Sequence, residues 1–155
     1  MAPAKAVPEG LRTITPGLVV DGALEAIEFY KKAFGAGERS RAMDPSGKKV
    51  WHAELRFGDS AVFINDAAPE MGTLAGISRL WIYTEGVDAA FQRAVAAGAT
   101  VRMALADMFW GDRMGQVADK WGNVWSLAQR IKDLSPGEMQ KAQDEFVAEM
   151  SKKKG

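Results

Sequence analysis

The single histidine of the chain, His52, stands two residues before an acidic side chain, Glu54. In an extended strand such residues share a face and lie about 7 Å apart along the chain. An imidazole and a carboxylate so placed are typical of a general base with its orienting partner, or of two metal ligands. The alternative is that His52 lines a cleft or a strand edge and hydrogen-bonds to backbone. A metal held by these two residues lacks further ligands unless another chain or loop supplies them.

A second group of candidate residues lies in "FWGDRMGQVADKWGNVWSL", which runs from Phe109 to Leu127 and contains three of the five tryptophans. Near its start, the indole of Trp110 and the guanidinium of Arg113 could stack on or clamp a planar, anionic ligand. The alternative is a packed loop in which Arg113 forms an ion pair with Asp112 or Asp119. The residues at the end of this stretch alternate, which predicts a strand with Trp125 and Leu127 in the core and Ser126 on the opposite face.

Composition excludes several classes of protein. The chain has 155 residues, 47% of them apolar and 26% charged, as in an ordinary globular protein with one domain or two small halves. Twenty basic and twenty acidic residues argue against nucleic-acid binding, which favours a basic surface. The absence of cysteine excludes disulfides and sulfur-ligated metals, and it is typical of a cytoplasmic protein. No signal peptide and no membrane span are expected, because long apolar runs are lacking.

The elements that must position these residues begin with a strand over residues 13–20. A helix follows within residues 21–37, and Gly35 is its expected left-handed C-cap. A strand at 38–43 and the turn "DPSGK" follow. The segment "VWHAELRF", residues 50–57, alternates with Trp51, Ala53, Leu55 and Phe57 on one face, and "GDSAVFI" completes a hairpin through Gly58 and Asp59.

The same order then starts again, with "RLWIYT", the helical "EGVDAAFQRAVAAGA" and three further strand segments up to residue 129. Asp21-Gly22 corresponds to Glu85-Gly86 at an offset of 64, and Gly35-Ala36 corresponds to Gly98-Ala99 at an offset of 63. Two helix ends at nearly one offset indicate an internal repeat. The predicted fold class is therefore α+β, with two tandem βαβββ modules forming a curved sheet and a cleft.

A third helix is predicted over residues 134–154, with Ser135 as N-cap, Pro136 at the first helical position and Glu138 completing a capping box. Its apolar stripe consists of Met139, Ala142, Phe146 and Met150. This stripe packs either on its own domain or across a dimer. We thus expect a flexible leader at 1–10, a two-module domain at 11–131 with modules at about 12–66 and 77–130, and a C-terminal helix and tail at 132–155.

Three segments, "ITPGLVVDGALEAIEFYKKAFGA", "HAELRFGDSAVFI" and "FWGDRMGQVADKWGNVWSL", resemble the vicinal oxygen chelate superfamily of glyoxalase I, extradiol dioxygenases and bleomycin-resistance proteins. Within it, the chain is most similar to the PhnB-like branch, over roughly Arg12 to Arg130. The resemblance implies paired βαβββ modules, a homodimer and a small-molecule ligand.

Metal-dependent members of that superfamily have His or Glu ligands on the first and last strands of each module. Carried over, these positions fall at Thr15 and at Phe63 or Ile64 in the first module, and at Arg79 and Ser126 in the second. None of these side chains suits a divalent cation. We therefore expect no metal and no cofactor.

Three functions remain open after this comparison. The first is a protein that binds or sequesters a small molecule in a dimer cleft, with ligand contacts from the residues named so far. These candidate ligand-binding residues are Thr15, His52, Arg79, Trp110, Arg113 and Ser126. The second is a lyase, isomerase or dioxygenase-type enzyme with His52 and Glu54 as catalytic residues. The third is a structural or regulatory dimer that uses the C-terminal helix.

Overall fold

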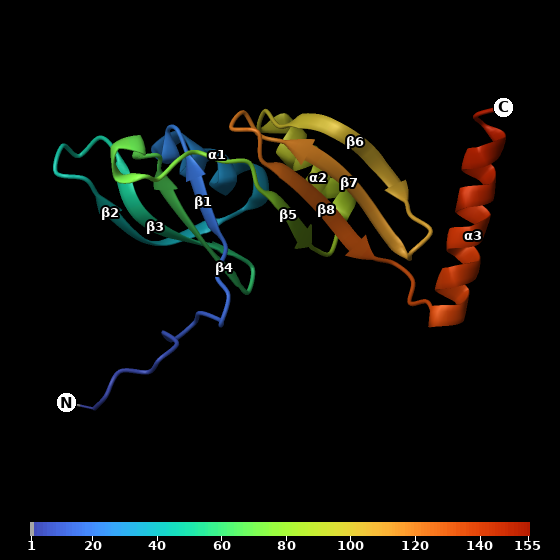
Figure 1. The fold of residues 1–155 in the computed structure, drawn as a ribbon, viewed down its shortest axis with the longest axis horizontal. Helices are drawn as coiled ribbons and strands as arrows, with labels where there is room; N and C mark the ends of the chain where they lie inside the picture. Colours follow the sequence, from blue (N-terminus) through green and yellow to red (C-terminus); the bar gives the residue numbers. More distant parts are fainter. Residues whose placement is uncertain (1) are drawn as a thin grey trace.

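The computed structural model describes residues 2–155, which form two four-stranded sheets and three α-helices (Figure 1). Met1, at the start of the expected leader, lies outside the described residues. The first module contains β1 (Gly17–Val20), α1 (Ala23–Phe34), β2 (Gly37–Met43), β3 (Val50–Phe57) and β4 (Ser60–Asp66). A short 3-10 helix, η1 (Pro69–Met71), follows. The second module contains β5 (Arg79–Tyr83), α2 (Val87–Ala96), β6 (Thr100–Asp107), β7 (Asp112–Ala118) and β8 (Val124–Arg130), and α3 (Pro136–Lys152) comes last.

The two sheets have the same topology, which confirms the predicted α+β fold of paired βαβββ modules. Their strand orders are β1-β4-β3-β2 and β5-β8-β7-β6, and in each sheet the first strand runs parallel to the last. The helix of each module covers one face of its sheet, while the opposite face is open (Figure 1). None of the helices described within residues 2–155 combines the length and the apolar character needed to cross a membrane.

One hydrophobic core joins the modules on the helix-covered side. Leu18, Ile27 and Leu55 of the first module and Val117 and Trp125 of the second belong to the same buried cluster. Trp125 and Leu127 are both about 1% exposed, so the predicted core face of β8 is confirmed. Because each sheet buries one face against its own helix, strand alternation decides which side chains remain on the open face.

Two local expectations about strands need correction. The first strand begins at Gly17 instead of Thr13, because Pro16 has no N–H to donate and the residues before it leave the sheet. Trp51 is 58% exposed and does not share the buried face of Ala53 and Leu55. The pairing of β2 with β3 shifts between Ala42 and Met43, and this bulge turns the Trp51 side chain out of the alternation.

The C-terminal helix α3 begins with the predicted capping box, in which the Ser135 hydroxyl accepts from the Glu138 amide and the Glu138 carboxylate accepts from the Ser135 amide. The helix stands apart from the body of the protein (Figure 1). Its residues are all described, and none of them is buried. The rings of Phe146 and Phe109 are in contact, with their centroids 5.0 Å apart. Met150, on the same predicted apolar stripe, is 46% exposed.

Candidate functional site

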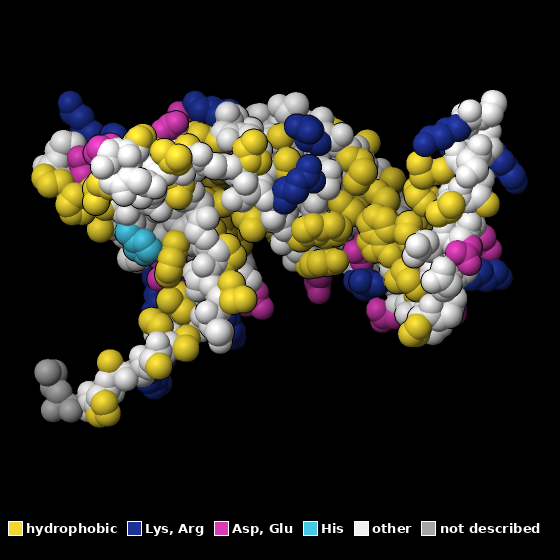
Figure 2. Space-filling model, in the orientation of Figure 1, with side chains coloured by type: hydrophobic (Ala, Val, Ile, Leu, Met, Phe, Trp, Pro, Cys, Tyr) yellow, Lys and Arg dark blue, Asp and Glu magenta, His cyan; other side chains and the backbone are white. Residues whose placement is uncertain are grey.

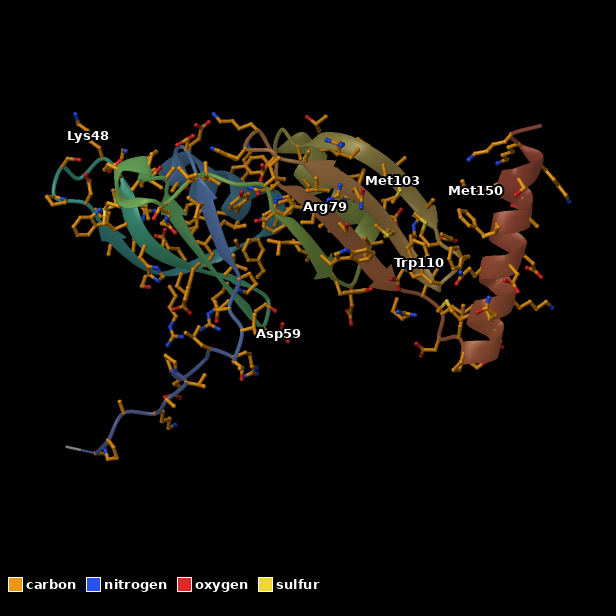
Figure 3. The ribbon with its side chains drawn as sticks, in the orientation of Figure 1. Lys48, Asp59, Arg79, Met103, Trp110 and Met150 are labelled. Carbon is orange, nitrogen blue, oxygen red and sulfur yellow. The ribbon has the colours of Figure 1, made fainter. Side chains whose placement is uncertain are left out.

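A cavity of about 610 Å³ lies at the junction of the two modules. Its walls are the segment before β1, the turn between β3 and β4, and the edge strand β5. Asp59 marks that turn at the gap between the two sheets (Figure 3). Most of the lining residues are aromatic or aliphatic. The lining includes Arg12, Thr15, Phe57, Asp59, Trp81, Tyr83 and Trp125.

Aromatic rings of the common core form the floor of this junction cavity. The indole of Trp125 stacks on Phe57, with ring centroids 5.4 Å apart and an interplanar angle of 24°. Phe34, at the end of α1, lies 4.7 Å from the same indole. Trp125 belongs to the second module and the two phenylalanines to the first, so the floor exists only because the modules pack together.

A buried carboxylate fixes the position of the Trp125 ring. Asp119 is 7% exposed, and it accepts hydrogen bonds from the Tyr30 hydroxyl at 2.7 Å and from Trp125 Nε1 at 3.0 Å. Its other oxygen accepts from the backbone amides of Trp121 and Asn123. Burial, followed by the charge of Asp119, raises the pKa of Tyr30 well above its ordinary value, so the phenol stays a hydrogen-bond donor.

Strand β5 supplies a second aromatic wall. Trp81 and Tyr83 lie two residues apart on one face, and their rings stack with centroids 6.1 Å apart and an interplanar angle of 25°. The Tyr83 hydroxyl donates to Asp112, which also accepts from Trp110 Nε1 at 3.0 Å. Desolvation and the neighbouring Asp112 raise the pKa of Tyr83. Trp81 and Tyr83 are 49% and 56% exposed, so both rings are accessible to a ligand.

His52 and Glu54 do share the open face of β3, but neither lines the junction cavity. His52 is exposed, as its cyan surface shows in Figure 2, and its ring meets the edge of Phe63 at a centroid distance of 4.5 Å. The carboxylate of Glu54 lies 2.6 Å from Arg56 and 3.5 Å from Arg39. No hydrogen bond joins His52 to Glu54 among the described residues, so the structure does not form the expected base and orienter.

The remaining expected ligand contacts, Thr15, Ser126 and Arg79, do not come together in the junction cavity. Thr15 lines the junction cavity as expected. Ser126 lies on the open face directly across from Trp81, but it is buried and accepts a hydrogen bond from Gln116. Arg79 is exposed at the start of β5, outside the cavity lining (Figure 3).

The structure does not bring Trp110 and Arg113, the expected clamp, together at the junction cavity. Trp110 lies in the turn between β6 and β7, far along the second sheet from Asp59 (Figure 3). Arg113 faces the helix-covered side, where Asp88 of α2 accepts from two of its nitrogens and Asp107 from a third. These pairs raise the pKa of Arg113 above its ordinary value. Arg113 thus forms ion pairs, as the alternative expected, but its partners are Asp88 and Asp107 and not Asp112 or Asp119.

The four positions that the resemblance assigns to metal ligands do not fit a divalent cation. Phe63 projects an apolar ring on the open face, Arg79 carries a positive charge, and Ser126 is engaged with Gln116. Within residues 2–155, no three side chains of His, Asp or Glu gather closely enough to hold a metal ion.

Sequence reasoning missed Trp81 and Tyr83 of β5 and Arg12 of the segment before β1, although it named Arg79 and Thr15 in the same segments. The alternation of Arg79, Trp81 and Tyr83 was visible in "RLWIYT" and could have indicated an aromatic face. Arg12 and Asp59 carried no such signal, because their proximity to the cavity depends on how the two modules pack.

Comparison with protein-family models gives a match over residues 12–127 to the Glyoxalase/Bleomycin resistance protein/Dioxygenase superfamily. The uncharacterized protein Rv0887c of Mycobacterium tuberculosis is 45% identical over 138 residues, which cover 83% of this chain and 81% of that protein. The match thus spans both modules, including the cavity walls.

Solved structures show the same fold at lower sequence identity. TioX from Micromonospora sp. ML1 superposes with a TM-score of 0.63 at 22% identity, over 80% of this chain and all of the other. The PhnB protein of Bacillus cereus, described as a putative 3-demethylubiquinone-9 3-methyltransferase, gives a TM-score of 0.58 at 23% identity, over 76% of this chain and 99% of that one.

Proposed function

Because this chain belongs to the Glyoxalase/Bleomycin resistance protein/Dioxygenase superfamily, we propose that it binds a small, planar and largely apolar molecule in the junction cavity. The observation that carries the proposal is the lining of that cavity, where aromatic rings from both modules meet a small number of polar groups. Ligand sites in proteins are typically concave, mainly apolar and equipped with few polar groups that orient the ligand. Binding or sequestration, without metal chemistry, is the function that these features support best.

The size and the chemistry of the cavity define the ligand class. A volume of about 610 Å³ lies in the range of roughly 300–1,000 Å³ that accommodates drug-sized molecules. The stacked pair of Trp81 and Tyr83 offers flat, accessible ring faces, which favour a flat ring system in the ligand. Arg12 and Asp59 would bind charged or polar substituents at the rim.

An enzyme that uses His52 and Glu54 receives less support from the structure. The Oε1 atom of Glu54 is paired with Arg39 and Arg56, and no hydrogen bond joins the carboxylate to His52 among the described residues, so Glu54 does not orient the imidazole as a base. His52 lies on the open face of the first sheet, away from the aromatic cavity.

The proposal is tested by titrating the protein with the aromatic dye 8-anilinonaphthalene-1-sulfonate, whose naphthalene ring system is flat, and measuring its fluorescence. Trp81→Ala should weaken binding about threefold to tenfold, because stacking on an aromatic ring contributes roughly 0.5–1.5 kcal/mol. Trp51→Ala removes an equally accessible indole that does not line the cavity, and it should leave the dissociation constant unchanged. Equal effects of the two substitutions would disprove binding at the junction cavity.

A dimer that uses α3 is a second candidate, favoured by the apolar surface that this helix exposes. Phe146, Val147 and Met150 are each more than 40% exposed, and apolar side chains gather along the side of α3 that faces the body (Figure 2). Isolated helices of this length are marginal in water, so packing against another surface would stabilise α3. Deletion of residues 134–155 should then change the mass measured by size exclusion with light scattering from that of two full chains to that of one truncated chain. A truncated protein that still has the mass of two of its own chains, with an unchanged unfolding midpoint, would rule this role out.

A further inference from the structure

The segment that leads into β1 is bound to the first sheet by two arginines. Arg56 Nη1 donates to the carbonyl oxygen of Gly10 at 2.8 Å. Arg39 Nη1 donates to the carbonyl oxygen of Glu9 at 3.4 Å. Glu9 and Gly10 were expected to belong to a flexible leader, yet both accept hydrogen bonds from the open face of the sheet.

Glu54 holds the two arginines in place. Its Oε1 atom lies 2.6 Å from Arg56 Nη2 and 3.5 Å from Arg39 Nη1. Arg56 thus binds Glu54 with one terminal nitrogen and Gly10 with the other, a double contact for which the guanidinium fork is suited and an ammonium group is not. The Glu54 side chain is 13% exposed, so the pair is largely shielded from solvent.

Gly10 gives an independent sign that the segment is seated against these side chains. A Cβ atom at this position would lie 2.8 Å from Arg39 Nη1 and 2.8 Å from Arg56 Nη2. The φ angle of Gly10 is +82°, which favours glycine over residues with a side chain. The backbone conformation therefore favours glycine at this position, and a Cβ atom there would displace the ends of the two arginine side chains.

The segment held in this way contributes one wall of the junction cavity. Gly10, Arg12, Ile14, Thr15 and Pro16 all line it. Ile14 is 82% exposed, so its side chain adds little packing that could keep the wall in place. Residues 10–16, attached at Gly10 by Arg56 and at Pro16 by the Phe63 amide, lie along one side of the cavity, and we call them the strap.

We propose that Glu54, Arg56 and Arg39 form a clasp that positions residues 10–16 as a wall of the ligand cavity. Glu54 is then a positioning residue for binding, acting through the two arginines. When the clasp opens, the wall carrying Arg12 and Thr15 moves away and the cavity becomes an open groove. The effect on affinity rests on the proposed binding function, whereas the attachment of the strap does not.

Limited trypsin digestion measures the attachment directly, because Arg12 lies within the strap and Lys5 lies before the clasp. Glu54→Gln should accelerate cleavage after Arg12 several-fold while cleavage after Lys5 keeps its rate. Glu38→Gln serves as the matched control, since Glu38 pairs with Arg41 at 2.7 Å in the same sheet but has no contact to the strap. Gly10→Ala, at a position outside every helix and strand, is a second variant that should accelerate cleavage after Arg12. Arg56→Lys should accelerate it as Glu54→Gln does.

The same variants are titrated with 8-anilinonaphthalene-1-sulfonate, and the clasp variants should raise its dissociation constant at least threefold. Unchanged cleavage after Arg12 in both Glu54→Gln and Gly10→Ala would overturn the clasp. Faster cleavage with unchanged dye affinity would overturn the role of the strap as a wall. Failure of the binding function itself is recognised separately, by a wild-type protein whose dye affinity does not respond to Trp81→Ala.

Discussion

At the scale of single residues, Asp119 connects the two modules. It accepts hydrogen bonds from Tyr30 in α1 and from Trp125 in β8, together with two backbone amides of its own turn. A charged acceptor surrounded by buried donors stabilises the fold mainly because the donors have no other partner. This residue therefore controls both the junction of the modules and the floor of the junction cavity.

We predict that Asp119→Ala lowers the free energy of unfolding by roughly 3 kcal/mol or more, because it leaves several buried donors without an acceptor. Urea unfolding followed by tryptophan fluorescence measures the change. Asp133→Ala, at an exposed acidic residue before α3, is the control and should change stability by less than about 0.5 kcal/mol. A similar loss in both variants would contradict the assigned role of Asp119.

Tyr30 should make the stability of the protein depend on alkaline pH. Its pKa is raised in the folded state, whereas in the unfolded chain it titrates near 10. Above about pH 10 the unfolded state loses the proton and the folded state keeps it, so stability falls as pH rises. Below that pH the contribution is fully present.

Tyr30→Phe should reduce this alkaline decline, at a cost of about 1–2 kcal/mol at neutral pH for the lost hydrogen bonds. Thermal unfolding between pH 8 and 11 provides the measurement. Tyr83→Phe is the comparison, because Tyr83 is 56% exposed and should contribute less to the decline. If Tyr30→Phe leaves the slope unchanged while Tyr83→Phe abolishes it, the assignment is wrong.

At the scale of elements, the internal repeat extends to the way each helix is capped. Asp66 at the end of β4 accepts from the amides of Gly22 and Ala23, at the start of α1. Gln129 near the end of β8 accepts from the amide of Val87, at the start of α2. Asp66 and Gln129 are 63 positions apart, within one residue of the offset of 64 that relates the starts of the two helices.

The two caps differ in strength, and this difference can be measured. Asp66 also accepts from the Val50 amide at 2.7 Å, so Asp66→Ala removes three hydrogen bonds and should cost about 2–3 kcal/mol. Gln129→Ala removes a single bond of 3.2 Å and should cost about 1 kcal/mol or less. Chemical unfolding of both variants tests the order, and a larger loss for Gln129→Ala would contradict it.

The elements were the part of the fold that the sequence predicted best. Glycines at the helix ends, alternation in the strands and the offset of the repeat indicated both modules and the capping box of α3. The exposed Trp51 was not predicted, because a bulge depends on the register of the neighbouring strand. The partners of Arg113 were missed for a similar reason: Asp88 lies on a helix that meets Arg113 only after the module has folded.

At the scale of the whole molecule, the candidate site is a property of the junction. Its floor combines rings from both modules, one wall is the edge strand β5, and another is the strap before β1. Sequence patterns within one module cannot specify a surface that exists only between two modules. Thr15 lines the cavity, whereas His52, Arg79, Trp110, Arg113 and Ser126 do not.

The five tryptophans allow one measurement to test the central claim, that ligands bind at the junction. In a ¹H–¹⁵N correlation spectrum each indole N–H gives its own signal, which Trp→Phe variants assign. Titration with 8-anilinonaphthalene-1-sulfonate should shift the signals of Trp81 and Trp125, which line the cavity, and leave those of Trp51 and Trp110 in place. Shifts at Trp51 or Trp110, with Trp81 and Trp125 unmoved, would contradict the account.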